Sequence, residues 1–575
     1  MNGFLTSAVA LLTATAFGAA PAGGVQLSIE QQDASGLTIS FALPQNLHRT
    51  VIEGIAPNRG NEGISAVTRL VAVPPNCRAE VYVIRRDARL VETAQFIDGT
   101  SSEDSSPRVD ARRIAAMSLD PPAAVSVGGV EVLRGLPVAP LTIHPVQLET
   151  GGTEAVLNLE LEVRVNFVPD PDAPPVRPIN DQPGSAGARM LDRWLLNQPH
   201  RDYQENQVDN RGRILIIHQD NEEFDRRGEA WVDSFATWKR RMGFRVDVEA
   251  FDLQQMQPSD IRTLIREDYY HQANDPISYL LIIGADSIEQ ELYFPSFRQQ
   301  GLIGDHFYSL MDDEDSYLSD IAVGRMNVHS FVELRGAVKR SILYEREPFT
   351  SQGTQWFGRA IYTAENIAAP GGQFVQSMIH LGEWVDMKLH QHGYSRVDIF
   401  YARNDNERID DQVRDALEDG RSLAISRGWL AGSYDVDNGR PADTGRKNPL
   451  VMAITCLSYE RISLFFRAAR ELDPIGPIAA YAIHGLTHSK TNNSLIGGMI
   501  NAMLRFDIFE PGWIQNYGKL QMISDNRFRI LDYHLETLSV FRLMGDPSVN
   551  IFTCLLYTSD AADELDGVDL GGRRI

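Results

Sequence analysis

From Arg211 onward, short apolar runs alternate with segments of helical character, and this alternation constrains the fold more than any other feature of the chain. Two of the runs read RILIIHQD (213–220) and YLLIIGAD (279–286). Apolar runs of four to eight residues that end in polar residues are typical of strands buried on both faces of a sheet. Because strands and helices alternate here, the sequence predicts an α/β fold with a parallel sheet.

This α/β part is predicted to consist of two subdomains, residues 211–350 and 351–553. A short helix is expected near Asp260, and a long helix over 331–345 closes the first subdomain. The second subdomain begins near Gly358 and contains the strand runs RAIYTAEN, VDIFYAR, RSLAIS, PLVMAIT and GPIAAYAI. Helices are expected between these runs and after them, over 374–392, 410–418 and 492–504.

The N-terminal part has a different pattern. The run NLELEVRVNF (158–167) alternates apolar and polar residues, which is typical of a half-buried antiparallel strand, and residues 25–168 are therefore predicted to form an all-β domain. Residues 169–187 are rich in Pro, Asp and Gly, and residues 169–210 are predicted to be a linker. Residues 1–22 are predicted to be a signal peptide, which implies a secreted or cell-surface protein. The alternative is a disordered apolar start to a cytosolic protein.

The last 22 residues have the character of foreign sequence. CLLYTSDAADE resembles the translation of a transposase-based sequencing adapter, and GVDLGGRRI resembles the translated far end of the same library fragment. Residues 554–575 are therefore excluded from the prediction of the fold. This resemblance implies that the native chain continues differently beyond Thr553.

Composition narrows the choice of function. The formal net charge is −23, from 54 basic and 77 acidic residues. Such an acidic protein repels phosphate backbones, so a nucleic-acid partner is not expected. Three cysteines are too few for a disulfide-built scaffold. The chain has no Walker loop and no GxGxxG, GxSxG, HExxH or CxxC motif, so the enzyme classes that those motifs mark gain no support.

Cys456 is the main candidate for chemistry. It follows the apolar run Leu450–Thr455 directly, and the carboxyl ends of parallel strands form the ligand crevice of α/β proteins. A thiol at such a place can be a nucleophile when a neighbouring group activates it. The alternative is a buried structural cysteine, because an unpaired cysteine packs as a small apolar residue.

Several stretches together resemble the gingipain family of cysteine peptidases. YLLIIGADS, followed by GDHFYSLMDDEDSYLSDIAVGRMNV, is similar to the first subdomain of that family. NPLVMAITC is similar to the strand that carries the nucleophile, and LMGDPSVNIF (543–552) to the family's final strand. Before the linker, VAVPPNCRAEVYVI and LELEVRVNF resemble the family's propeptide. The resemblance covers residues 68–553, with gaps.

The resemblance implies a secreted zymogen with a β propeptide and a caspase-like catalytic domain of two subdomains. Cleavage of protein or peptide substrates would use a Cys–His dyad, with Cys456 as nucleophile. The backbone N–H groups of Cys456 and Gly428 would form the oxyanion hole. Some family members process surface proteins in connection with type IX secretion, so the secretion machinery is an expected partner. Arg177, Arg189, Arg193, Arg201 and Arg211 are candidate positions for propeptide cleavage.

At the position of the catalytic histidine this chain departs from the family pattern. The turn that should read Gly-His-Gly reads Ser426-Arg427-Gly428, and arginine stays protonated and cannot act as a general base. The positive charge of Arg427 would still lower the pKa of Cys456. His484, at the end of the following strand, is the alternative base, and a strand-end cap is the other interpretation of it. Two hypotheses follow: a cysteine endopeptidase, or an inactive pseudopeptidase that serves in surface binding or assembly.

One acidic cluster is a candidate metal site. Asp312, Asp315 and Asp320 could supply oxygen ligands to a structural Ca²⁺, although their spacing does not fit an EF-hand. The alternative is a solvated acidic loop, and no other cofactor is expected. The sequence leaves substrate specificity and oligomeric state open.

Overall fold

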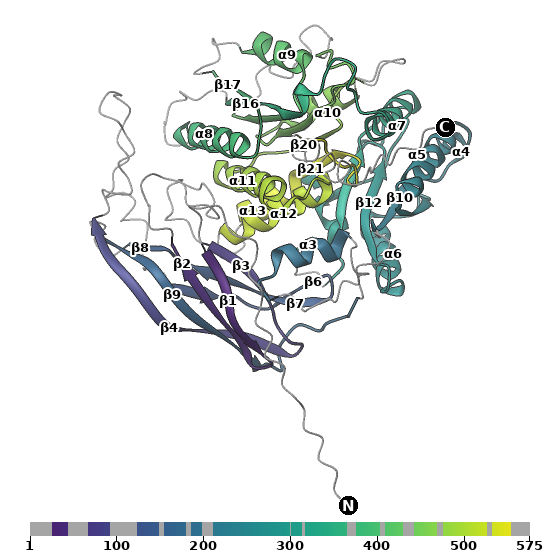
Figure 1. Cartoon of the computed structure of the whole chain (residues 1–575). Coiled ribbons are helices and arrows are strands. Elements are labelled where there is room, and N and C mark those ends of the chain that lie inside the picture. The colour runs from purple at the N-terminus through teal and green to yellow at the C-terminus, as the bar shows by residue number, and fades with distance from the viewer. Residues whose placement is uncertain are drawn as a thin grey trace, which may run out of the picture. The chain divides into compact units, whose positions relative to one another are not determined.

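The computed structural model describes residues 26–43, 67–92, 123–148, 154–179, 186–197, 211–299, 301–312, 317–364, 375–402, 409–428, 442–467, 475–525 and 532–553 (Figure 1). The chain divides into two compact units. The first consists of residues 1–131, 137–176 and 194–199, and the second of residues 132–136, 177–193 and 200–575.

The strands of the N-terminal region pair antiparallel in two sheets. One sheet has the order β1-β2-β9-β4, with β8 also on β9, and the other has the order β3-β7-β5, with β6 also on β7. Their bounds are β1 Gln26–Asp33, β2 Gly36–Ala42, β3 Val67–Ala72, β4 Cys77–Glu92, β5 Val125–Val127, β6 Glu131–Leu133, β7 Leu136–Ile143, β8 Val146–Leu148 and β9 Glu154–Pro169.

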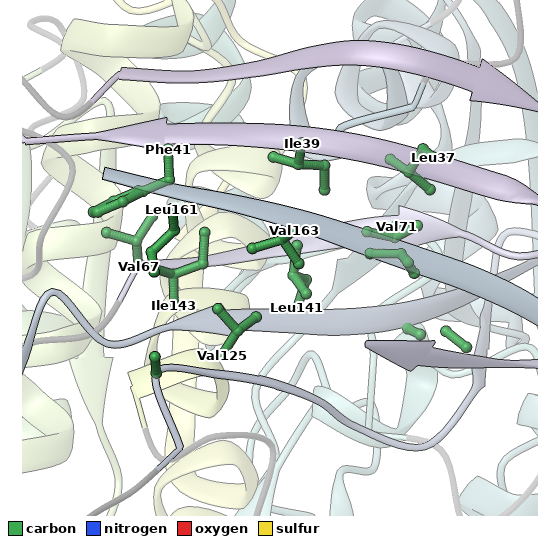
Figure 2. Packing of buried hydrophobic residues seen from close by; sticks show 14 of the residues in the cluster. Leu37, Ile39, Phe41, Val67, Val71, Val125, Leu141, Ile143, Leu161 and Val163 are labelled. Atoms are coloured by element: carbon green, nitrogen blue, oxygen red, sulfur yellow. The ribbon is translucent and has the colours of Figure 1, made fainter. Parts of the chain in front are cut away.

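The core of this unit lies between its two sheets, as the period of two in the sequence requires. Leu37, Ile39 and Phe41 alternate along β2 and are fully buried. They pack with residues of the other sheet, among them Leu141 and Ile143 of β7 (Figure 2). Along β9, the buried apolar positions alternate with charged positions that keep some exposure, so the alternating strand expected over 158–167 is present.

The second unit is built around a ten-stranded sheet. Its order is β11-β10-β12-β15-β21-β20-β19-β18-β16-β17. The strands β11, β10, β12 and β15 are parallel to one another, as are β20, β19, β18, β16 and β17, whereas β21 runs antiparallel to β20. Their bounds are β10 Arg213–Gln219, β11 Arg245–Phe251, β12 Ile277–Ile283, β15 Ala322–Met326, β16 Arg359–Ala364, β17 Arg396–Tyr401, β18 Leu423–Arg427, β19 Leu450–Ala453, β20 Ala479–Ile483 and β21 Phe541–Gly545.

Helices connect these strands, together with a small hairpin of β13 (Phe297–Gln299) and β14 (Leu302–Gly304). Among the described residues, every helix is too short or too polar to span a bilayer. The helices are α3 Ala186–Trp194, α4 Glu222–Arg227, α5 Glu229–Arg241, α6 Pro258–His271, α7 Phe331–Arg346, α8 Val375–Gln391, α9 Asp410–Asp419, α10 Tyr459–Arg467, α11 Ser489–Phe506, α12 Pro511–Asp525 and α13 Asp532–Val540, with 3₁₀ turns at His306–Ser309 and Gln355–Gly358.

Several helical features differ from the sequence prediction. Helix α3 lies within the predicted linker 169–210, and α10 and α13 were not predicted. The short helix expected near Asp260 is wrong in length, because α6 has 14 residues. A capping box of Gln257 and Asp260 starts this helix, and Ile261, Ile265 and Tyr269 bury one face of it. The sequence analysis also missed α12. This helix is buried almost all round and therefore lacks the amphipathic period that reveals a helix.

Helices cover both faces of the second unit's sheet. Ile361 and Tyr362 are neighbours on β16, so their side chains point to opposite faces. Ile361 packs in a cluster with Val413 of α9 and Ile462 of α10. The hydroxyl of Tyr362 donates to a carbonyl of α8, on the other face. This double coverage explains why the strands read as continuous apolar runs.

The carboxyl ends of several strands meet at one edge of the sheet. Arg542 lies at the start of β21, opposite the end of β20. Its Nη1 lies 2.9 Å from Oδ2 of Asp286, just beyond β12, and donates to the hydroxyl of Tyr459 at 3.1 Å. The Tyr459 hydroxyl donates in turn to Oδ1 of Asn327, just beyond β15. Polar side chains from both subdomains therefore gather at this edge.

A buried lysine makes the stability of the second unit pH-dependent. Nζ of Lys519 lies 3.1 Å from Nδ1 of His306, and burial lowers the pKa of Lys519 to about 7. Because the unfolded lysine keeps its proton up to about pH 10, the unfolded chain binds more protons between pH 7 and pH 10. The free energy of unfolding should therefore rise with pH across this window. Relative to Lys519→Met, the wild type should gain up to about 1.4 kcal/mol per pH unit.

Urea denaturation of both proteins at pH 7, 8, 9 and 10 measures this difference. Lys339, an exposed lysine of α7, supplies the matched control Lys339→Met, for which the difference should stay constant with pH. A constant difference for Lys519→Met as well would contradict the assignment of the buried, proton-releasing lysine.

Candidate active site

Cys456 lies in a sharp strand-to-helix turn at the carboxyl edge of the sheet. The fully buried strand β19 ends three residues before it, and α10 begins three residues after it. Leu457 has φ +56°, a left-handed conformation that a residue with a side chain rarely adopts. The N–H of Leu457 donates to the carbonyl of Gly485 at 2.9 Å, which fixes the turn. Cys456 is half-buried within it.

The thiol of Cys456 contacts the segment between β20 and α11. Its Sγ lies 3.3 Å from the carbonyl oxygen of Thr487, to which the thiol donates. The backbone N–H of Thr487 points back to the same sulfur, also at 3.3 Å. The two backbone groups of Thr487 therefore hold the sulfur in place.

Arg427 ends β18, the strand beside β19, and its guanidinium is buried against neutral acceptors. Nη1 donates to the carbonyl of Ile454 at 2.7 Å, and Nε donates to Oδ1 of Asn493 at 3.0 Å. Nη2 donates to Oγ of Ser489 at 2.9 Å and to its carbonyl at 3.2 Å. Burial lowers the pKa of Arg427, but a guanidinium keeps its proton at neutral pH. A fixed positive charge therefore lies beside the Cys456 strand.

Gly428 follows Arg427 with φ +81°, a conformation suited to glycine. Its carbonyl accepts a hydrogen bond from Oγ1 of Thr455, the residue before the cysteine. The turns that end β18 and β19 are thereby tied together. Gly428 and Cys456 are thus neighbours across this edge.

His484 lies one residue beyond β20, and its ring is directed toward α10. The ring packs edge-on against Tyr459 with 4.6 Å between centroids, and Nε2 lies 3.8 Å from Oε1 of Glu460. Burial, and then the charge of Arg542, lower the pKa of His484, so the imidazole is neutral near pH 7. Among the interactions of the described residues, none joins His484 to Cys456.

Residues 207–552 match the family model of peptidase family C25. The chain belongs to the gingipain family of cysteine peptidases. This finding confirms the family resemblance carried by the sequence.

Solved structures agree on the fold of this C25 family member. It is similar to the crystal structure of the Arg-specific cysteine proteinase gingipain R, with 18% identity, a TM-score of 0.52, and coverage of 61% of this chain and 80% of that one. It is equally similar to the complex of the pro- and mature domains of a gingipain from Porphyromonas gingivalis, with 19% identity, a TM-score of 0.52, and coverage of 59% and 80%. No curated protein sequence matches the chain. The predicted α/β fold with a caspase-like sheet and an all-β N-terminal region is confirmed.

In the acidic cluster of this C25 homologue, two of the three aspartates accept hydrogen bonds from other groups of the protein. Oδ1 of Asp320 accepts from the N–H of Arg134 at 2.7 Å, and Oδ2 accepts from the N–H of Met311 at 2.7 Å. Asp312 accepts from the Tyr270 hydroxyl. Asp315 lies outside the described residues, and within them no group of three metal-ligating side chains occurs. The Ca²⁺ site remains a prediction.

Sequence reasoning missed the residues that surround Arg427 and Cys456. Thr487, Ser489 and Asn493 come from the turn after β20 and the first turns of α11, where the sequence shows no catalytic motif. The sequence contains one weak indication that these residues belong to the site, because their segment follows a buried strand that ends at the same edge of the sheet. His218, next to the last residue of β10, stacks on Phe224 with 4.0 Å between ring centroids.

Proposed function

We propose that this C25 homologue engages a protein or peptide substrate through Cys456 at the carboxyl edge of the second subdomain, and that amide hydrolysis there is strongly reduced. The observation that carries this proposal is the burial of Arg427, which has four hydrogen bonds to neutral acceptors. A side chain held in this way has no freedom to move aside for another base.

The chemistry of a cysteine peptidase explains the reduction. One group must take the thiol proton and later give a proton to the leaving amine. A thiolate at Cys456 can attack a carbonyl carbon. The amine nitrogen then needs a proton before the C–N bond breaks, and a guanidinium does not supply it at neutral pH. Without that proton the tetrahedral adduct expels the thiolate again, and the peptide bond is restored.

A second candidate function is an active cysteine endopeptidase with His484 as the base. One observation favours it: His484 lies near the carboxylate of Glu460, the kind of partner that orients a catalytic imidazole. In this function the ring of His484 would rotate from Tyr459 toward Cys456, because a general base acts within about 3.2 Å of the atom that carries the proton.

Hydrolysis of a fluorogenic peptide library separates the two functions. We expect the wild type to hydrolyse no faster than Cys456→Ala, and His484→Asn to leave the low rate unchanged. If the wild type instead turned over and both variants lost that turnover, His484 would be the base. Iodoacetamide should add one more adduct to the wild type than to Cys456→Ala, as counted by mass spectrometry of the intact proteins, which shows that the thiol is accessible. Circular dichroism of both proteins supplies the control that they are folded.

Secretion, with the protein released or held at the cell surface, and contact with a secretion machinery are part of this proposal. The apolar stretch within residues 1–22 supports export. Fusing residues 1–25 to a reporter enzyme that is active only outside the cytoplasm tests it. A reporter that stays inactive would remove this part of the proposal.

A further inference from the structure

The turn Val132–Leu136 presents an arginine at its tip. Arg134 and Gly135 have φ +50° and +68°, so both central residues of this two-residue connection between β6 and β7 are left-handed. Glycine and asparagine are the usual residues in such turns. An arginine in this conformation is strained, and it persists only where its surroundings hold it.

The surroundings of Arg134 do hold it. The residue is only 2% exposed. Its backbone N–H donates to Oδ1 of Asp320 at 2.7 Å, and its Nη1 donates to the carbonyl of Asp320. Its guanidinium carbon lies 5.8 Å from the ring centres of both Tyr269 and Trp513. The guanidinium thus lies among backbone carbonyls and aromatic rings, which are partners suited to its planar donors and its charge.

Glycine leaves the space for this side chain. A Cβ on Gly187 of α3 would lie 2.5 Å from the guanidinium carbon of Arg134, closer than atoms can approach. The pocket also borders the carbonyl of Ile277, the first residue of β12. Asp320 lies two residues before β15. The pocket is therefore at the amino edge of the sheet, opposite the edge that carries Cys456.

Two further contacts of the same unit come from residues 177–193. Nη2 of Arg189 lies 3.3 Å from Oε1 of Glu510, and the guanidinium of Arg177 lies 5.2 Å from the ring centre of Tyr270. Ile179 packs against the apolar cluster of β10, β12 and α6. Arg134, Arg177 and Arg189 thus all precede residue 198 in the sequence and all contact residues beyond 211.

We propose that residues 211–553 form an arginine-binding pocket at the amino edge of the sheet, filled by Arg134, and that this pocket anchors the chain before residue 198 after any cut between 198 and 210. The ligand class is an arginine at the tip of a β-turn, and in the intact protein the occupant is the chain's own segment 132–136. Arg134 is the main anchor because it alone of the three arginines is buried. The inference does not depend on Cys456 being active.

Cleavage at an engineered protease site within residues 200–210 tests the anchor in the full chain. After cleavage, the two wild-type pieces should co-elute in gel filtration, whereas Arg134→Ala should weaken their association at least about 30-fold, as loss of a buried arginine hot spot does. Arg89, an exposed arginine of β4, provides the matched control Arg89→Ala, which should co-elute as the wild type does. Separation of the wild-type pieces, or equal affinity for Arg134→Ala, would overturn the proposal.

A peptide competition keeps the proposal testable if Arg134→Ala fails to fold. A cyclic peptide with the sequence of residues 130–138 is added to the cut wild-type protein, beside the same peptide with alanine at the arginine position. The arginine peptide should displace the N-terminal piece at a concentration at least about 30-fold lower than the alanine peptide. Equal displacement by the two peptides would show that the guanidinium does not provide the anchor.

Discussion

Arg427→His is expected to raise kcat/KM for peptide hydrolysis about 10²- to 10⁴-fold, the usual contribution of a positioned group that acts as general acid and base. The imidazole would end β18 beside the Cys456 strand, the position implied by the family pattern. The substitution would also remove a buried charge. The side chains of Ser489 and Asn493 would remain as hydrogen-bond partners for the imidazole. The measurement is hydrolysis of a fluorogenic peptide by the full chain, before and after cleavage within residues 200–210.

Arg427→Gln is the matched control for this prediction, because its amide keeps hydrogen-bonding groups at the site and supplies no base. It should hydrolyse no faster than the wild type. Adding Cys456→Ala to Arg427→His should abolish the gain. A gain that survives the loss of Cys456 would show that the new activity arises elsewhere, and no gain in a folded Arg427→His protein would mean that more than this position separates the site from catalysis.

Lys239→Met is expected to lower the free energy of unfolding by about 3–5 kcal/mol, because it leaves two buried carboxylates without their cation. Nζ of Lys239 lies 2.9 Å from Glu345 and 2.5 Å from Asp546, and all three side chains are at most 2% exposed. Burial alone would lower the pKa of Lys239, but the two carboxylates outweigh it and raise that pKa. Urea denaturation at pH 7 measures the loss.

An exposed ion pair at the carboxyl end of α7 supplies the control for this second prediction. Arg346 and Glu347 are each about half exposed, so Arg346→Ala should change stability by less than about 1 kcal/mol. A Lys239→Met protein as stable as the wild type would mean that the carboxylates take up protons or water at no net cost. If protons are taken up, the stability of Lys239→Met should fall as pH rises above 7, and urea denaturation at pH 7, 8 and 9 would reveal this.

The Lys239 network illustrates what the sequence does not reveal. Lys239 comes from α5, Glu345 from α7 and Asp546 from the end of the chain, and each looks like an ordinary surface residue in its own segment. Charged residues are mostly exposed, so the sequence gives no reason to bury them. The same holds for Arg134, which sequence reasoning placed in the β region without a role, although the structure encloses it in the second unit.

The fold class, the position of Cys456 at a strand end and the presence of an arginine at 427 can be inferred from the sequence alone. These features are local: periodicity, strand-end position and motif order are written along the chain. The partners of Arg427, the orientation of His484 toward Glu460 and the burial of Arg134 are visible only in the folded protein. Those features depend on contacts between segments far apart in the sequence, where packing selects one of many arrangements that local preference permits.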